Sequence, residues 1–211
     1  HNLGYTVSGS DISESANVKK LQSEGVEIFI GHNSSNITNA QLVVYSSAIN
    51  NKNPEVLKAQ ELKIPIVKRA EMLAELMRLK YGIAIAGSHG KTTTTSFVST
   101  IFHNLNKKPT CIVGGIVKNL GGQALKGDSE YLIAEADESD GSFLFLNPIM
   151  SVITNVDNDH MDYYHTEENI KKAFVEFSNK VPFYGCVAIN GNDKNSVELM
   201  KDIRRPYIVY G

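Results

Sequence analysis

The residues best suited to chemistry in this 211-residue chain form a glycine-rich loop, GSHGKT, at positions 87–92. It lies between an apolar stretch, residues 82–86, and a predicted helix, residues 91–106. The glycines let several backbone N–H groups point at one anion, and the helix N-terminus adds the positive end of its dipole. Lys91 supplies a full charge and Thr92 a hydroxyl for Mg²⁺. We therefore predict a triphosphate site. Its predicted contacts are Gly87, Ser88, His89, Gly90, Lys91, Thr92 and Thr93.

This loop departs from the general phosphate-loop pattern in one respect. The pattern G-x-x-x-x-G-K-[ST] would place glycine at position 85, where the chain has Ile85. The alternative is a glycine-rich turn that happens to precede a helix. We favour the phosphate loop because strand, loop, Gly-Lys-Thr and helix occur together. The run of threonines at 92–95 is also poor helix material that packing alone would not select.

An acidic segment, EADESDGSF at 135–143, follows an apolar strand predicted at 131–134. Carboxylates so close together repel one another unless a cation or hydrogen-bond donors lie among them. A solvated acidic loop is the alternative, and we favour it for Asp140 alone. Glu135 directly follows the strand, at the carboxyl edge where doubly wound sheets bind ligands. We predict that Glu135 is a metal ligand.

A second polar segment, NVDNDHMD at 155–162, follows the strand predicted at 151–155. If the two strands are neighbours, Glu135, His160 and Thr92 converge beside the phosphates. Mg²⁺ prefers oxygen, but imidazole is acceptable where substrate and waters fill the other positions. A structural role for a lone histidine stays open. We predict Thr92, Glu135 and His160 as metal ligands, and Lys91, Glu135 and His160 as catalytic residues.

The elements that must position these residues alternate between short apolar strands and helices. We predict a first domain over residues 1–79. Strands are predicted at 5–8, 26–30, 42–45 and 64–67, and helices at 14–24, 53–62 and 70–80, the last of which reaches the domain boundary. This rhythm predicts a parallel sheet covered on both faces, as in a Rossmann-like domain. The abrupt start of the sequence leads us to expect an earlier strand and loop.

The rhythm restarts at residue 81, so we predict a second domain over residues 80–211, incomplete at its C-terminal end. Its fold class is a mostly parallel α/β domain of the phosphate-loop type. Further strands are predicted at 110–113, 186–189 and 207–209, and a helix at 167–179. The helix after the phosphate loop is expected to bury a set of apolar side chains. These are Phe97, Val98, Ile101, Phe102 and Leu105.

Composition excludes several classes of protein. Hydrophobic residues make up 42% and charged residues 21%, as in soluble globular proteins. The net charge of −2 argues against a nucleic-acid-binding protein. No apolar run reaches the roughly 18 residues of a membrane span, and none resembles a signal peptide. Cys111 and Cys186 are expected to be buried thiols in a cytoplasmic protein rather than a disulfide.

Three segments in this order, GSHGKTTT, EADESDGSF and NVDNDHMDYY, resemble the Mur ligase family. The opening SGSD, the Gly31-His32 turn and the SSAI segment are similar to the UDP-binding domain of that family. The resemblance implies a cytoplasmic, ATP-dependent, amide-forming ligase of peptidoglycan precursor synthesis that joins L-alanine to UDP-N-acetylmuramate. ATP would phosphorylate the substrate carboxylate, and the amine would attack the acyl phosphate. The protein would be a monomer or homodimer with no nucleic-acid or membrane partner.

The resemblance also implies roles for individual residues. Lys91 would hold the β- and γ-phosphates, Thr92 and Glu135 one Mg²⁺, and His160 a second. Residues 190–193 would lie near the adenine. The residues implied to face the UDP-sugar are Asp11, Ser46, Ser47, Ala48 and Ile49. Compared with the family, the chain lacks the glycine-rich loop expected before residue 1 and the C-terminal domain, so we expect this fragment alone to be inactive.

Three alternatives remain at this stage. The first is the related ligase that reattaches recycled murein tripeptide, against which Ser139, Gly141 and Met161 argue. The second is a nucleotide-binding module without catalytic activity, which has little use for so many carboxylates at strand ends. The third is an NAD-dependent dehydrogenase, in which Asp11 would contact the ribose, but the GSHGKT loop suits a triphosphate better.

Overall fold

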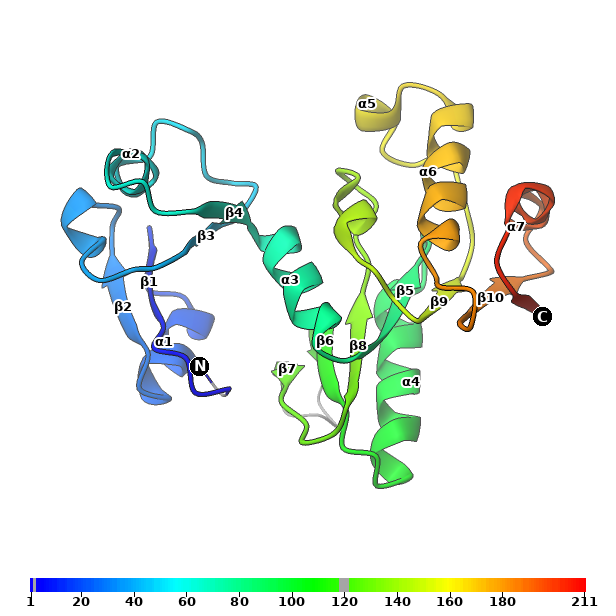
Figure 1. Cartoon of the computed structure of the whole chain (residues 1–211), viewed down its shortest axis with the longest axis horizontal. Helices are drawn as coiled ribbons and strands as arrows, with labels where there is room; N and C mark the ends of the chain where they lie inside the picture. Colours follow the sequence, from blue (N-terminus) through cyan, green and yellow to red (C-terminus); the bar gives the residue numbers. More distant parts are fainter. Residues whose placement is uncertain (2, 118–121) are drawn as a thin grey trace. The chain divides into compact units, whose positions relative to one another are not determined.

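A computed structural model describes residue 1 and residues 3–117 and 122–211 of the chain. The chain forms two compact units, His1–Met72 and Leu73–Gly211 (Figure 1). The predicted domain boundary between residues 79 and 80 stays a prediction. Among the described residues, no helix combines the length and the apolar character that crossing a membrane requires.

The first unit consists of parallel strand pairs and short helices. Strands β1 and β2 form one parallel pair, and β3 and β4 form another. Parallel pairing confirms the predicted Rossmann-like character, although the four strands form two separate two-stranded sheets rather than one sheet. The elements are β1 (Ser8–Asp11), α1 (Ala16–Ser23), β2 (Glu27–Ile30), η1 (Ser34–Asn36), β3 (Val43–Tyr45), α2 (Pro54–Glu61) and β4 (Ile66–Lys68).

Local sequence signals explain where these elements begin. The Asn53 side chain accepts the N–H of Glu55 at 2.9 Å, and Pro54 occupies the first turn of α2, as predicted for a capped helix start. The strand predicted at residues 5–8 is wrong, because β1 spans Ser8–Asp11. Its register with β2 runs from Ser8 opposite Glu27 to Asp11 opposite Ile30, so pairing with β2 determines the strand's bounds.

The second unit is built on a seven-stranded sheet in the order β11-β10-β9-β5-β8-β6-β7. Neighbouring strands are parallel except β6 and β7. Helix α3 (Arg69–Arg78) leads into this unit. The strands are β5 (Tyr81–Ala86), β6 (Thr110–Val117), β7 (Gly122–Leu125), β8 (Tyr131–Glu135), β9 (Met150–Ile153), β10 (Cys186–Asn190) and β11 (Tyr207–Tyr210). The helices are α4 (Lys91–Asn104), η3 (Ser142–Phe145), α5 (Met161–Tyr164), α6 (Glu167–Asn179), α7 (Lys194–Leu199) and η4 (Met200–Asp202).

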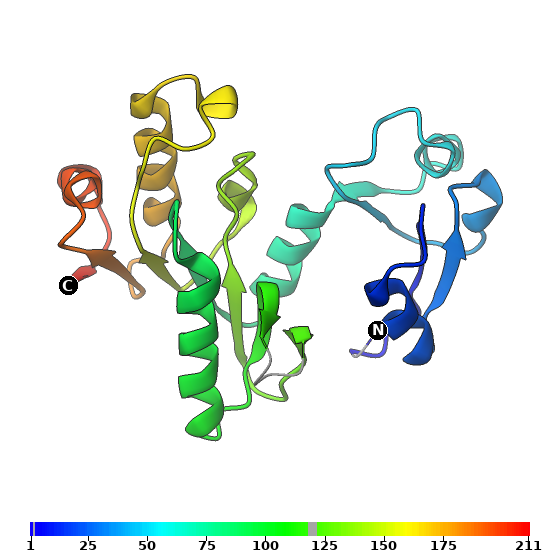
Figure 2. The same cartoon turned by 180° about the vertical axis from the view of Figure 1, so that it is seen from behind.

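Alternate residues of β5 face two different cores, as the period of a strand requires. Ala84 and Ala86 belong to the larger core, which includes Phe174 of α6, whereas Ile83 and Ile85 belong to the smaller core under α4. Figures 1 and 2 show α4 and α6 on opposite faces of this sheet. The sheet is therefore covered on both faces, and the predicted mostly parallel α/β fold class is confirmed.

The predicted buried face of α4 is only partly right. Val98 and Phe102 pack against the smaller core, but Phe97, Ile101 and Leu105 are 65%, 56% and 64% exposed. Residues spaced by four lie on one side of a helix, so the three exposed residues share one stripe. The side that meets the sheet instead carries small polar residues, including fully buried Thr95 and Ser99. Small side chains let the helix lie close to the sheet.

Both cysteines are free thiols, as predicted, but the expected burial is wrong for Cys186, which is partly exposed. Cys111 is buried in the smaller core, and burial raises the pKa of its thiol. The short elements β7, α5 and α7 were not predicted from the sequence, and β9 ends at Ile153, two residues earlier than expected. The next two residues, Thr154 and Asn155, hydrogen-bond the loop at 87–90 instead of continuing the strand.

The two aromatic residues Phe174 and Phe97 provide a matched test of the core. Phe174 is fully buried, and its ring centroid lies 5.3 Å from that of Phe143. We expect Phe174→Ala to lower the free energy of unfolding by about 3–5 kcal/mol through loss of buried area and creation of a cavity. Phe97→Ala in this chain should change it by less than about 0.5 kcal/mol. Urea unfolding followed by circular dichroism would measure both, since the chain has no tryptophan. Equal losses would contradict the assignment of the two helix faces.

Candidate nucleotide-binding site

The predicted phosphate loop connects the end of β5 to the start of α4. Gly87 and Gly90 have φ values of +140° and +80°, a region that favours glycine. Gly90 is the N-cap residue of α4, and no described side chain caps this helix. The first N–H groups of α4 are therefore suited to an anionic ligand.

Hydrogen bonds clamp this loop to the segment after β9. The N–H groups of Ser88 and His89 donate to the carbonyl and the Oδ1 of Asn155, at 3.1 and 2.8 Å. In return, Thr154 Oγ1 and Asn155 Nδ2 donate to the carbonyl of His89, at 2.7 and 2.9 Å. The Asp157 N–H donates to Ser88 Oγ at 2.8 Å. Residues 154–157 thus hold the phosphate loop, and we call these contacts the loop clamp.

Gly87 has no room for a side chain. A Cβ atom at this position would collide with Thr154 Oγ1 and would lie 3.1 Å from the backbone of Asn155. The positive φ of Gly87 adds strain for any other residue. Glycine is therefore required by the clamp as well as by the turn.

Lys91, in the first turn of α4, points back over the loop. Its Nζ donates to the carbonyls of Gly87 and Ser88, at 2.7 and 3.3 Å, and to Glu138 Oε1 at 2.7 Å. An ammonium group has three N–H donors, so these acceptors account for all of them. The amine lies at the predicted triphosphate site, held by the loop itself and by one carboxylate.

Glu138 is a site residue that sequence reasoning did not single out. Its side chain is fully buried, and Oε1 lies 2.7 Å from Lys91 Nζ and 3.7 Å from His160 Nε2. Burial raises the pKa of the Glu138 carboxyl, and the hydrogen bond from Lys91 offsets part of that rise. In the sequence it is one carboxylate among several in the acidic segment, and no spacing distinguishes it from its neighbours.

The predicted metal ligands form two contacts. Thr92 Oγ1 donates to Glu135 Oε1 at 2.8 Å, which brings two oxygen ligands together at the phosphate loop. His160, with a φ of +56°, has its Nε2 atom close to carboxylate oxygens of Glu138 and Asp159. In the described part of the chain, no three His, Cys, Asp or Glu side chains gather to hold a metal ion.

These oxygen ligands fit Mg²⁺, which commonly binds one or two protein groups plus substrate phosphates and waters. The metal and catalytic roles of Thr92, Glu135 and His160 stay predictions. We expected these three residues to converge if the strands before the two polar segments were neighbours. That condition is wrong, because β8 and β9 are not neighbours. Each pairs with β5 instead, one on either side, so the two polar segments flank the phosphate loop.

Residues 190–193, predicted to lie near the adenine, brace the segment after β9. Asn190 Nδ2 donates to the Thr154 carbonyl at 2.8 Å, and Asp193 Oδ2 accepts the Val156 N–H at 3.1 Å. Asp193 also caps α7 by accepting the N–H of Ser196 at 2.8 Å. The contacts support the loop clamp, and the adenine role stays a prediction.

In the first unit, the predicted sugar-binding residues follow strand ends. Asp11 closes β1, is exposed, and accepts the Ser13 N–H through Oδ1 at 3.1 Å. Residues 46–49 follow β3 in a turn closed by the Ile49 N–H on the Ser46 carbonyl at 3.0 Å. The role of Asp11, Ser46, Ser47, Ala48 and Ile49 stays a prediction.

Sequence reasoning also missed a polar network in this unit. Ser10 Oγ donates to Glu55 Oε2 at 2.8 Å and lies 2.9 Å from His32 Nδ1 in a hydrogen bond. Glu55 Oε1 accepts from Asn36 Nδ2 at 2.7 Å. The network ties the end of β1 and the loop after β2 to the first turn of α2. The Gly31-His32 turn was the only signal of it in the sequence.

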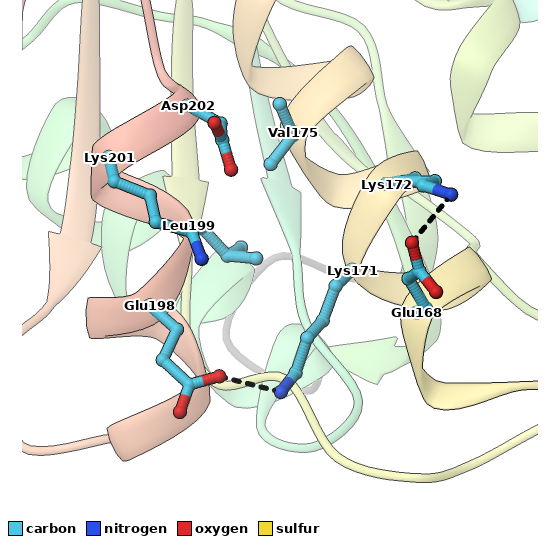
Figure 3. Close-up of a pocket in the computed structure, with 8 residues that line it drawn as sticks. All are labelled: Glu168, Lys171, Lys172, Val175, Glu198, Leu199, Lys201 and Asp202. Atoms are coloured by element: carbon cyan, nitrogen blue, oxygen red, sulfur yellow. Dashed lines mark hydrogen bonds and ion pairs between the residues drawn. The ribbon is translucent and has the colours of Figure 1, made fainter.

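A hollow of about 410 Å³ in the second unit lies between α6 and the α7–η4 segment (Figure 3). Its lining carries equal numbers of basic and acidic side chains, and two pairs, Lys171 with Glu198 and Lys172 with Glu168, are bonded at 2.8 Å. These balanced charges do not favour a triphosphate. The lining residues are Glu168, Lys171, Lys172, Val175, Glu198, Leu199, Lys201 and Asp202.

The fit at Gly87 can be tested against another glycine of positive φ. We expect Gly87→Ala to weaken ATP binding by about tenfold or more, because the added methyl group must displace Thr154 and misalign the loop. Gly25→Ala is the control: Gly25 has a φ of +88°, but a Cβ there would meet no atom within 4 Å. Calorimetric titration with ATP would measure both. Unchanged binding by Gly87→Ala would rule out the loop clamp as a requirement for nucleotide binding.

Known proteins match the chain along nearly all of its length. The sequence profile of the "Mur ligase family, catalytic domain" matches residues 1–81, and that of the "Mur ligase middle domain" matches residues 85–211. UDP-N-acetylmuramate–L-alanine ligase of Nitratidesulfovibrio vulgaris is 55% identical over 100% of this chain and 46% of its own length. The ligase of the same name from Aquifex aeolicus is 52% identical over 99% of this chain and 46% of its own length. The chain thus spans slightly less than half of these relatives.

Solved structures agree with this match. UDP-N-acetylmuramate-alanine ligase from Thermotoga maritima has a TM-score of 0.85 and 30% identity, covering 94% of this chain and 46% of that one. The UDP-N-acetylmuramate:L-alanyl-gamma-D-glutamyl-meso-diaminopimelate ligase from Neisseria meningitides has a TM-score of 0.90 over 100% of this chain and 71% of that one. At 22% identity, the second likeness shows the fold alone. With both profiles matched in order, the chain belongs to the Mur ligase family.

Proposed function

We propose that the complete protein is a cytoplasmic, ATP-dependent ligase that joins L-alanine to UDP-N-acetylmuramate. The observation that carries the proposal is the clamped phosphate loop, with Lys91 over its carbonyls and the Thr92–Glu135 pair beside it. The relatives that match at 52% and 55% identity bear the name of this ligase, which supports the choice of substrates.

The chemistry accounts for the types of residue at the loop. A carboxylate is a poor electrophile, so its oxygen must first attack the γ-phosphorus of ATP, releasing ADP and leaving an acyl phosphate. The nitrogen of L-alanine then attacks the acyl carbon, loses a proton, and expels inorganic phosphate. The first step brings two anions together, and fixed positive charge is needed to screen their repulsion. Bound Mg²⁺ would supply part of that screening.

The residues of this chain divide the work. Lys91 offers its ammonium group to the β- and γ-phosphates, exchanging contacts with the loop carbonyls for contacts with phosphate oxygens. Thr92 and Glu135 would hold Mg²⁺ through their oxygens, and His160 would hold a second ion. In the first unit, Asp11 and residues 46–49 would bind the UDP-sugar.

Lys91→Ala should lower alanine-dependent phosphate release about 10²–10³-fold, the loss typical of removing one group that stabilises the transition state. The assay uses the full-length protein with ATP, Mg²⁺, UDP-N-acetylmuramate and L-alanine. Lys172→Ala is a matched control, since Lys172 is an exposed lysine of α6 paired with Glu168. A rate unchanged by Lys91→Ala would show that the loop has been assigned wrongly.

Magnesium separates the ligase from a nucleotide-binding module without chemistry. We expect chelation of Mg²⁺, and separately His160→Ala, to weaken ATP binding measured by calorimetry, because phosphate charge is then less well screened. A module that binds nucleotide alone would bind ATP equally well in all three conditions. Offering L-alanine against murein tripeptide distinguishes the recycling ligase, and we expect phosphate release only with L-alanine.

A further inference from the structure

Glu138 joins two segments of the candidate site through a single oxygen atom. Its Oε1 contacts Lys91 of the phosphate loop at 2.7 Å and His160 of the second polar segment at 3.7 Å. These two residues follow β5 and β9, and Glu138 lies in the turn that follows β8. One carboxylate therefore links residues from three strand ends.

Stability alone does not account for a carboxylate in this place. Glu138 is fully buried, and its second oxygen, Oε2, has no hydrogen-bond partner among the described atoms. A buried unpaired acceptor is costly, and buried ion pairs often contribute no more stability than apolar residues of similar size. A buried polar group that is only partly satisfied suggests a requirement other than folding.

The backbone around Glu138 fixes the direction of its side chain. The carbonyl of Glu138 accepts the hydroxyl of buried Tyr164 at 2.6 Å and the N–H of Gly141 at 3.0 Å. Gly141 has a φ of +71°, and a Cβ there would collide with the Tyr163 ring. The turn is thus held by α5, so the Glu138 carboxylate is presented from a rigid frame.

We propose that Glu138 is a positioning residue for phosphoryl transfer, an inference that rests on the proposed ligase function. Its carboxylate keeps the Lys91 ammonium at the phosphate loop while Lys91 exchanges the carbonyls of Gly87 and Ser88 for phosphate oxygens. The same carboxylate orients the His160 ring, whose Nε2 lies 3.7 Å from Oε1. The negative charge of Glu138 offsets the positive charge of Lys91, so Glu138 does not strengthen the binding of ATP. Glu138 instead aligns the charged groups that act on the transferred phosphoryl group.

Glu138→Gln tests the proposal in the full-length enzyme, since glutamine keeps the shape and one acceptor oxygen but removes the charge. We expect kcat to fall about 100-fold, as expected for a misplacement of about 1 Å. The Kd for ATP should stay within about threefold of the unchanged protein or become tighter, because a negative charge near the phosphates is lost. A crystal structure of the variant should show displaced Lys91 Nζ and His160 atoms.

Asp140→Asn is the matched control, because Asp140 lies in the same segment, is exposed, and accepts the Ser142 N–H at 3.0 Å rather than contacting Lys91 or His160. It should leave kcat and the Kd for ATP unchanged. An unchanged kcat in Glu138→Gln, a Kd for ATP that rises as much as kcat falls, or an unmoved Lys91 Nζ would each overturn the proposal.

Failure of the proposed function would look different. If the full-length protein without substitutions lacks alanine-dependent activity, the proposed function itself fails, and the ATP affinity and the Lys91 position still test the positioning role. Should Glu138→Gln not fold, Glu138→Asp, with a shorter reach, is expected to show the same separation of kcat from Kd.

Discussion

The candidate site depends on the clamp between the phosphate loop and residues 154–157. Strands β5 and β9 run side by side up to Ala86 and Ile153, and the chains then exchange hydrogen bonds beyond the end of the sheet. Gly87 makes this possible because its missing side chain leaves room for Thr154. The N–H groups of Ser88 and His89 are used in these long-range contacts, which fix the loop and so position the start of α4, whose first N–H groups would meet an anion. Preorganisation of this kind lowers the cost of binding, since little must move when the ligand arrives.

The order of the strands explains why three distant segments share one edge. Strand β5 lies between β8 and β9, so the residues that follow all three strands meet at their carboxyl ends. Lys91 and His160 are far apart in sequence, but both lie near the same carboxylate oxygen of Glu138. The near-neutral net charge of the chain is consistent with this arrangement, because the positive charge available to an anion is local. In the described part of the chain, Lys91 and the start of α4 supply it at the phosphate loop.

The sequence contained the parts of the site that depend on local chemistry. Helix α6 has the predicted bounds, Glu167–Asn179, because Thr166 caps it and its apolar residues keep helical spacing. The phosphate loop was predictable for the same reason, since glycine, lysine and threonine act through the backbone next to them. What could not be predicted depends on tertiary contacts. Whether the apolar stripe of α4 is exposed, and whether Glu138 is buried, depends on what each packs against in the folded chain. The residue types alone are compatible with either outcome.

Unfavourable local features gather at the same edge of the sheet. His160 is a non-glycine residue with a positive φ, and Glu138 has a buried oxygen without a partner among the described atoms. Each feature costs free energy and persists only where the surrounding structure allows no alternative. Here the surroundings are the paired ends of β5, β8 and β9 and the buried rings of Phe143, Phe174 and Phe177 behind them. The apolar core thus supplies the stability that keeps polar groups at the strand ends in arrangements that folding alone would not select. A site that must align charge needs such a stable support.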